Sequence, residues 1–187
     1  MSKVEILPAT PDRWDDLERL FGPSGASYGC WCMWFRRRSS EMAKAKAREN
    51  KADIKSLVES GEEPGLIAYV DREVAGWVSL DRKANYPRLV HSTSLKRLGL
   101  DDEGSIWSVV CFVVGKEHRR TGLSGRLLEG AIDYAKAHGA TMLEAYPVEP
   151  TEELKGDRGY HGVRSVFDRA GFVEVARDGR PIMRLEF

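Results

Sequence analysis

The sequence lacks a net charge, a long apolar run and a paired set of cysteines. Lysine plus arginine and aspartate plus glutamate each number 29, so the formal charges cancel at pH 7. A general affinity for nucleic acid or for an anionic membrane is therefore not expected. Residues 1–7 lack the apolar core of a signal peptide, and no apolar run is long enough to span a bilayer. We expect a cytoplasmic protein with no nucleic-acid or membrane partner.

Cysteine is scarce as well, with only Cys30, Cys32 and Cys111 in 187 residues. An odd number in a chain of this length gives no sign of a disulfide framework. Cys30 and Cys32 could supply two ligands to a metal, but no second pair of Cys or His stands at finger-like spacing, so we expect no metal. Cys111 falls within a strand-like run, where a buried small apolar residue is the simpler interpretation.

Familiar nucleotide-binding and nucleophile motifs are also missing. The chain has neither the Gly-Lys-Ser/Thr of a P-loop nor the Gly-x-Gly-x-x-Gly of a dinucleotide-binding fold. The run Gly122-Leu123-Ser124-Gly125 resembles a hydrolase nucleophile elbow, but that motif has one more residue between the serine and the second glycine. These absences exclude the commonest phosphate and acyl-enzyme motifs.

What the chain does have is a strand, a basic turn and a long helix between residues 106 and 138. Residues 106–114 are almost all β-branched or aromatic, which is typical of a strand covered on both faces. Beyond Gly122, apolar side chains recur every three or four residues up to Gly139, which predicts a helix with one face against a sheet. The apolar positions are Leu123, Leu127, Leu128, Ala131, Ile132 and Ala135.

The turn between this strand and this helix is rich in basic and small residues. The first amides of a helix have no intrahelical partner and the helix dipole is positive there, so a phosphate can bind. Small residues let the phosphate reach the backbone, and arginines add charge-assisted contacts. We therefore predict a diphosphate cradle, made of Lys116, His118, Arg119, Arg120, Thr121, Gly122, Ser124 and Gly125.

The run Arg119-Arg120-Thr121-Gly122-Leu123-Ser124 resembles motif A of the GCN5-related N-acetyltransferases, the GNAT family. That signature reads Gln/Arg-x-x-Gly-x-Gly/Ala and lies between the family's fourth strand and third helix. Ser124 occupies the last position, and Gly125 follows it directly. Ala170-Gly171-Phe172 also stands where the family has Gly-Phe before its sixth strand.

The remaining elements follow the order of this family from end to end. We expect a strand at 4–7, a helix from 10 to about 22, a second helical region at 40–60 broken near Asn50, a hairpin of 65–70 and 74–80, a loop at 81–104 with a helical turn at 94–98, a strand at 142–146, an irregular stretch at 147–159, a short helix at 162–170, and strands at 172–176 and 181–187. The resemblance implies one domain over residues 1–187 with an α/β (α+β) fold. Its mixed sheet of about six or seven strands would be flanked by about four helices and would splay between strands 4 and 5.

The resemblance further implies transfer of an acetyl group from acetyl-CoA, as cosubstrate, to a primary amine by direct attack in a ternary complex. The pantetheine arm would lie along the backbone of Phe112, Val113 and Val114, in the opening between the fourth and fifth strands. Phe167 would lie beside it. The diphosphate would be held by Arg119, Arg120, Thr121, Gly122, Leu123, Ser124 and Gly125.

The expected proton donor departs from the family pattern. Many members place a general-acid Tyr four residues before the Gly of Gly-Phe, but here that position is Phe167, and a phenyl ring cannot give a proton. Tyr160, His161 and Tyr146 are nearby alternatives, and we choose Tyr160.

For the base we choose Glu144, because an unpaired carboxylate in a covered strand would have a raised pKa. Alternatively, Glu144 pairs with a nearby cation, and His91 or His161 takes the proton.

The acceptor site implied by the resemblance includes the aromatic stretch 28–35. Trp31 and Trp34, together with Tyr146, could stack on a planar or cationic acceptor, or could instead be core. Arg36-Arg37-Arg38 could meet an acidic group, although such runs are usually solvated. We expect a small-molecule amine as acceptor. The alternatives are a protein N-terminus or lysine, and an acyl-CoA-binding sensor that has lost its chemistry; a homodimer is left open.

Overall fold

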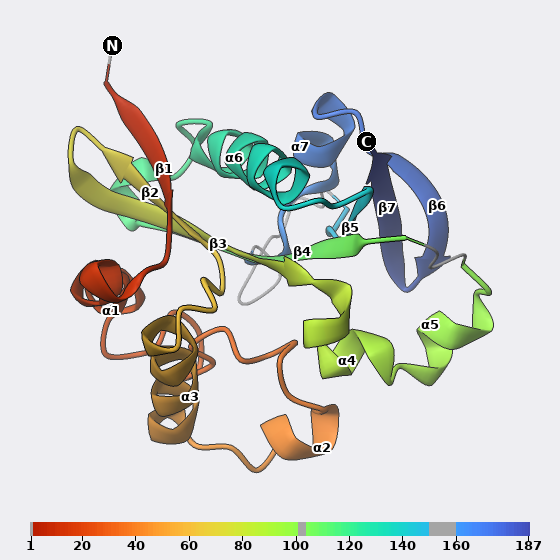
Figure 1. The fold of residues 1–187 in the computed structure, drawn as a ribbon, viewed down its shortest axis with the longest axis horizontal. Helices are drawn as coiled ribbons and strands as arrows, with labels where there is room; N and C mark the ends of the chain where they lie inside the picture. Colours follow the sequence, from red (N-terminus) through yellow and green to blue (C-terminus); the bar gives the residue numbers. More distant parts are fainter. Residues whose placement is uncertain (1, 101–103, 150–159) are drawn as a thin grey trace.

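The computed structural model describes residues 2–100, 104–149 and 160–187 (Figure 1). Most of the irregular stretch expected at 147–159 lies outside these residues. The described chain forms one seven-stranded sheet in the order β1-β2-β3-β4-β5-β7-β6, with every neighbouring pair antiparallel except β4 and β5. The strands are β1 (Val4–Pro8), β2 (Leu66–Val70), β3 (Glu73–Arg82), β4 (Ile106–Val114), β5 (Met142–Ala145), β6 (Val173–Asp178) and β7 (Arg180–Glu186). The α/β class and the mixed sheet are as the sequence predicts.

Helices cover both faces of this sheet. Figure 1 shows α6 and α7 on one face and α1 and α3 on the other. The described helices are α1 (Trp14–Phe21), α2 (Ser39–Met42), α3 (Ala47–Glu59), α4 (Pro87–Val90), α5 (Thr93–Arg97), α6 (Leu123–Ala137) and α7 (Arg164–Arg169), with 3-10 turns at Pro11–Arg13, Lys83–Asn85 and Lys116–His118. No helix among the described residues is long and apolar enough to cross a bilayer.

The sheet separates two apolar cores. Leu17 and Phe21 of α1 pack with Ile54 and Val58 of α3 on one face. Leu127 and Leu128 of α6 pack on the other face. Strand β4 contributes to both cores, because all its residues except Val114 are buried. The β-branched and aromatic run therefore forms the two-sided central strand that its composition predicts.

Strand β4 carries a bulge at its middle residue, Val110. Ser79 of β3 pairs with Cys111, whereas the next residue, Leu80, pairs with Val109. Val110 is therefore the extra residue, and both Val110 and Cys111 belong to the core on the α1 and α3 face. Bulges bend a strand locally and re-aim side chains, which is why they recur beside functional sites.

Two short helical features differ from the sequence-based expectation. The predicted helical region at 40–60 is two helices separated by residues 43–46, and the break near Asn50 is wrong. Asn50 lies inside α3, where its buried side chain donates a hydrogen bond to the Gly29 carbonyl at 2.9 Å. The expected loop at 81–104 contains the unpredicted α4, while the helical turn expected at 94–98 is confirmed as α5.

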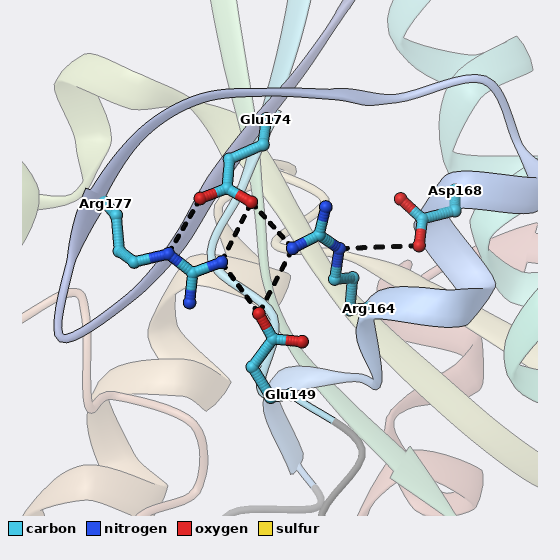
Figure 2. Close-up of polar contacts among 5 residues, drawn as sticks. All are labelled: Glu149, Arg164, Asp168, Glu174 and Arg177. Carbon is cyan, nitrogen blue, oxygen red and sulfur yellow. Dashed lines mark hydrogen bonds and ion pairs between the residues drawn. The ribbon is translucent and has the colours of Figure 1, made fainter.

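A charged network fixes the entrance to α7. Arg164 at the start of α7 contacts Glu174 of β6 at 2.6 Å and Glu149, which follows β5, at 3.1 Å; Arg177 binds the same two carboxylates at 2.7 to 2.9 Å (Figure 2). Asp168 adds a contact to Arg164 at 3.5 Å. A backbone hydrogen bond joins the same two segments, because the amide of Arg164 donates to the carbonyl of Val148 at 2.9 Å. The short segment before α7 is thereby held against the chain that leaves β5.

Candidate active site

The two parallel strands separate after four paired residues. Pairing runs from Ile106↔Met142 to Val109↔Ala145, after which β4 continues to Val114 without β5 beside it. The bulge at Val110 is the first residue beyond this pairing. Beyond Val109 the backbone of β4 therefore has no neighbouring strand among the described residues on this side, and the splay expected between strands 4 and 5 is present.

The turn before α6 has the features of an anion cradle. From Arg120 to Ser124, no backbone amide donates a hydrogen bond to another described residue. Gly122 has φ +86°, and a side-chain carbon there or at Gly125 would meet nothing within 4 Å. Arg120 also has a left-handed backbone, φ 63°. Such a conformation is costly for a residue with a side chain and collects at functional loops. The exposed turn thus presents unsatisfied amides at the positive end of a fifteen-residue helix.

The cradle is linked to the end of β4. Arg119 donates from Nε to the carbonyl of Val114 at 3.3 Å, and Thr121 donates its hydroxyl to the carbonyl of His118 at 2.7 Å. These contacts set the turn directly beyond the unpaired part of β4. Residues 110–125 consequently form a continuous path from the strand gap to the helix N-terminus.

Phe167 is a core residue and not an exposed wall of the gap. It is fully buried and packs edge-on against Phe112 at 6.0 Å and Phe172 at 5.3 Å between ring centroids. A side-chain carbon at Gly162, φ +77°, would lie 2.8 Å from the Phe167 ring. The chain before α7 can therefore pass this close to Phe167 only with glycine at that position.

On the α1 and α3 face, next to the bulge, lies a cavity of about 350 Å³. The segment between α1 and α2 forms one wall. Helix α2 adds two side chains, the link between α2 and α3 adds two, and α3 and α4 add one each. Cys111 of β4 and the residues just before α7 complete it. The described lining residues are Ser27, Tyr28, Cys30, Cys32, Trp34, Phe35, Ser39, Met42, Ala43, Ala45, Asn50, Arg88, Cys111, Tyr160 and His161.

Two proton-carrying side chains of this cavity are held by carbonyl groups. His161 Nδ1 lies 3.2 Å from the carbonyl of Val110, the bulge residue. Because a carbonyl only accepts, this contact requires the proton on Nδ1 and makes Nε2 the basic nitrogen. Tyr160 donates its hydroxyl to the carbonyl of Ala26 at 3.0 Å, and burial raises the pKa of Tyr160. A phenol that keeps its proton suits a general acid.

Glu144 does not line this cavity, and its carboxylate is paired with two cations and a phenol. It is 1% exposed, and Arg184, directly opposite it on β7, binds Oε2 through Nε at 2.7 Å and Nη2 at 2.6 Å. Lys83 lies 3.0 Å from Oε1, and the hydroxyl of Tyr146 also donates to Oε1. The alternative in which Glu144 pairs with a cation is therefore the one found. The predicted catalytic pair, Tyr160 and Glu144, is not brought together in the cavity described above.

The predicted aromatic acceptor residues divide between core and cavity. Trp31 is 4% exposed and stacks on Phe21 at 5.4 Å, so it is core. Tyr146 is also buried and stacks on Phe35 at 6.4 Å. Trp34 is 42% exposed and lines the cavity. Of the three, only Trp34 lies on a described cavity wall beside His161.

The arginine run is not simply solvated. The Arg36 side chain is 6% exposed and forms a 2.8 Å ion pair with Asp81 of β3, with its guanidinium 4.9 Å from the centre of the Tyr86 ring. Arg37 pairs with Asp53 of α3. Arg38 contacts His91 at 3.0 Å, and His91 is exposed and does not line the cavity. The expectation of a solvated run is wrong for Arg36, because Asp81 supplies a buried partner.

All three cysteines are free thiols on the cavity wall. A hydrogen bond with Cys32, together with burial, raises the pKa of Cys30, and burial raises that of Cys32. Neutral thiols are poor nucleophiles and poor metal ligands. Among the described residues, no group of three His, Cys, Asp or Glu side chains could hold a metal ion. Cys111 is buried as its position in a strand predicts.

Sequence reasoning missed several cavity residues, above all Arg88. It lies on α4, in a stretch expected to be loop, and a single arginine after a proline carries no recognisable signal. Ser39, Met42 and Asn50 were missed for a similar reason, because their approach to the cavity depends on how α2 and α3 pack.

A family model described as the acetyltransferase (GNAT) family matches residues 30–155. Among solved structures, the PaiA N-acetyltransferase from Thermoplasma acidophilum in complex with coenzyme A is similar with a TM-score of 0.55 and 16% identity, covering 99% of each chain. A GNAT-family acetyltransferase from Listeria monocytogenes has a TM-score of 0.59 at 11% identity, covering 98% of this chain and 95% of that one. An N-acetyltransferase from Staphylococcus aureus Mu50 has a TM-score of 0.55 at 13% identity, covering 99% of each chain. No curated protein matches the sequence. At these identities the structural likeness shows the shared fold.

Proposed function

The chain belongs to the GNAT family of acetyltransferases, and from this premise we propose that it moves an acetyl group from acetyl-CoA to the primary amine of a small molecule, by direct attack in a ternary complex. The observation that carries the proposal is that a cradle of unpartnered amides and a separate side-chain cavity lie at opposite ends of the unpaired part of β4. Residues 1–187 would act as one domain.

Acetyl-CoA supplies the activated acetyl thioester. On this proposal, the amides from Arg120 to Ser124 hold its diphosphate, with the side chains of Arg119 and Arg120 adding charge. Backbone groups of Phe112 and Val114, which alternate with those turned toward β3, hold its pantetheine arm as an added strand would. Support comes from the open space around Gly122 and from the coenzyme A found in the PaiA complex. Phe167 supports this strand from the core through Phe112.

The acceptor amine must be deprotonated before it attacks. An amine with a pKa of about 10.4 is protonated at neutral pH, and the free base costs about 4 to 5 kcal/mol there. We assign the base to His161, which lines the cavity with its Nδ1 fixed on the bulge carbonyl. Tyr160 beside it is the candidate to protonate the departing thiolate. Glu144 is assigned a structural part, because its carboxylate binds two cations and a phenol.

The cavity favours a small acceptor. Its volume of about 350 Å³ is at the lower end of small-molecule pockets. Trp34 and Phe35 provide flat apolar contacts of the kind that hold an aromatic or aliphatic body. A peptide would have to enter with only one side chain or its terminal residue.

Turnover is tested by incubating the enzyme with acetyl-CoA and a panel of amines, measuring released thiol and identifying the N-acetyl product. We expect acetylation of at least one small amine. Acetylation confined to peptides would replace this proposal by the protein-modifying alternative. Tight binding of coenzyme A with no turnover across the panel would favour a binding domain that has lost its chemistry, as the absence of the family Tyr at Phe167 allows.

A further inference from the structure

Arg88 is a cavity residue held in place by uncharged groups. Its guanidinium lies 4.1 Å from the centre of the Trp34 ring. Nε and Nη2 donate to the Ser39 hydroxyl at 3.3 and 3.0 Å, and Nη1 donates to the Trp34 carbonyl at 3.1 Å. These three hydrogen bonds and the contact with the Trp34 ring fix the direction of this side chain.

No carboxylate neutralises Arg88 among the described residues. The neighbouring Arg36 and Arg37 both have one, Asp81 and Asp53. Arg88 forms no ion pair with any described residue, and burial without an opposing charge lowers its pKa. Because a guanidinium keeps its proton in proteins, Arg88 holds a positive charge partly withdrawn from water.

The geometry leaves donors for a ligand. A guanidinium has five N–H groups, and three are used by Ser39 and Trp34, so one remains on Nη1 and one on Nη2. A pair of donors on neighbouring nitrogens matches the two oxygens of a carboxylate. Stacking on Trp34 keeps this pair in a defined plane.

The described walls of the cavity have no competing charge. Among these lining residues Arg88 alone carries a fixed charge, and no aspartate or glutamate is present. These walls offer no acidic partner for the further ammonium groups of a polycationic acceptor. The Arg88 amide also donates to the Phe35 carbonyl at 3.2 Å, and the Phe35 ring packs edge-on against His161 at 5.6 Å. Phe35 therefore connects the charged wall to the candidate base.

We infer that the acceptor is a compact amine bearing a carboxylate, an amino acid or a close relative, with the carboxylate bound end-on by Arg88 and the apolar body against Trp34 and Phe35. This assignment rests on the proposed function and names its substrate class. The amine of such a molecule lies in the same cavity as His161 and Cys111, beside the strand gap.

The test compares matched acceptors that differ only at the carboxylate. Each standard amino acid and its carboxamide is assayed with acetyl-CoA, using wild-type enzyme, Arg88→Gln, Arg88→Lys and the control Arg97→Gln, an exposed arginine on α5 outside the cavity. We expect the acids to be preferred. Arg88→Gln should raise KM for the best acid by about 10- to 100-fold with kcat within about twofold, because charge-assisted hydrogen bonds are lost. Arg88→Lys should recover part of the loss, and carboxamide kinetics should not change.

A binding measurement keeps this inference separate from the proposed function. Thermal shift with the same acids and carboxamides, without acetyl-CoA, should show stabilisation by acids in the wild-type enzyme and not in Arg88→Gln. That result without acetyl transfer would uphold the carboxylate site and overturn the transferase proposal. Preference for carboxamides or simple amines, no binding of any acid, or an unchanged KM in Arg88→Gln would overturn the inference while leaving acetyl transfer intact.

Discussion

At the scale of single residues, the molecule separates charges that hold the fold from groups that can move protons. Glu144 is enclosed by Arg184, Lys83 and Tyr146, and Arg36 is enclosed by Asp81 and Tyr86. A buried charge of this kind is costly to leave without its partner. His161 and Tyr160 instead contact neutral carbonyls and line the cavity. The contact of His161 and Tyr160 with the cavity is the reason that our proposal places the proton transfers on these two residues.

Replacing Glu144 by Gln should lower stability without changing the chemistry. The loss of its charge leaves the buried Arg184 guanidinium beside a neutral amide, so we expect the free energy of unfolding to fall by about 3 kcal/mol. Urea unfolding measures this loss, and Glu186→Gln, at the exposed end of β7, is the matched control. The rate per folded molecule should stay within about twofold. A large loss of kcat with unchanged stability would instead make Glu144 the base.

His161→Gln and Tyr160→Phe should differ in how the rate depends on pH. Without the imidazole, kcat/KM should fall by about 100-fold and lose the rise with pH that deprotonation of a base imposes. Tyr160→Phe should slow turnover by about tenfold and keep that rise, because the base remains. Both rate profiles are measured by thiol release. A retained rise in His161→Gln would assign the base to another group or to water.

At the scale of elements, the charged network around Arg164 and Arg177 positions the segment that carries Tyr160 and His161 (Figure 2). Its members come from α7, from β6 and from the chain after β5. The contribution of each exposed pair is small, but the network joins side chains of all three segments. The position of His161 against Val110 therefore depends on contacts made outside the cavity.

The network should stabilise the protein at neutral pH and lose its effect in acid. Hydrogen bonds from Arg177 hold the pKa of both Glu149 and Glu174 below the ordinary carboxyl value. A depressed pKa means that the stabilisation is complete above the ordinary carboxyl pKa and disappears as the pH falls through the lowered value. Arg177→Gln should therefore lower Tm near pH 7, and the difference from wild type should shrink below about pH 4.

The control is Arg19→Gln, which breaks a separate surface pair with Asp16 on α1. Its effect on Tm should be smaller, since one exposed i,i+3 pair contributes little. Added salt should weaken the Arg177 effect as well. A Tm difference for Arg177→Gln that is constant with pH would show that packing of this side chain, and not its charge, stabilises the region.

At the scale of the whole molecule, the sequence predicts the frame better than the site. The two-sided strand β4, the helix α6 and the turn between them follow from residue patterns that depend only on neighbours in sequence. Helices α2 and α4 have four residues each, too few to show a helical period. The local sequence therefore gave no sign that the helix ends at Met42 or that α4 forms.

Side-chain partners were the least predictable feature. Glu144 meets Arg184 only because β5 and β7 pair in that register, and Arg36 meets Asp81 only after the segment following α1 folds onto β3. The same holds for Arg88, which reaches the cavity through the packing of α4 beside Trp34. Residue type suggested aromatic contacts for both Trp31 and Trp34, but only tertiary packing distinguishes the buried ring from the exposed one.

The central claim is that the turn before α6 binds coenzyme A, and calorimetry with two matched glycine variants tests it most directly. Gly122 and Gly139 stand at opposite ends of α6 with φ +86° and +79°, and a side chain at either meets nothing within 4 Å. Leucine should therefore strain the backbone alike at both places, by about 1 to 2 kcal/mol, and only Gly122 lies in the cradle. Wild type and Gly139→Leu should bind coenzyme A, and Gly122→Leu should bind at least about tenfold more weakly. No binding by the wild-type protein, or equal binding by both variants, would contradict the account.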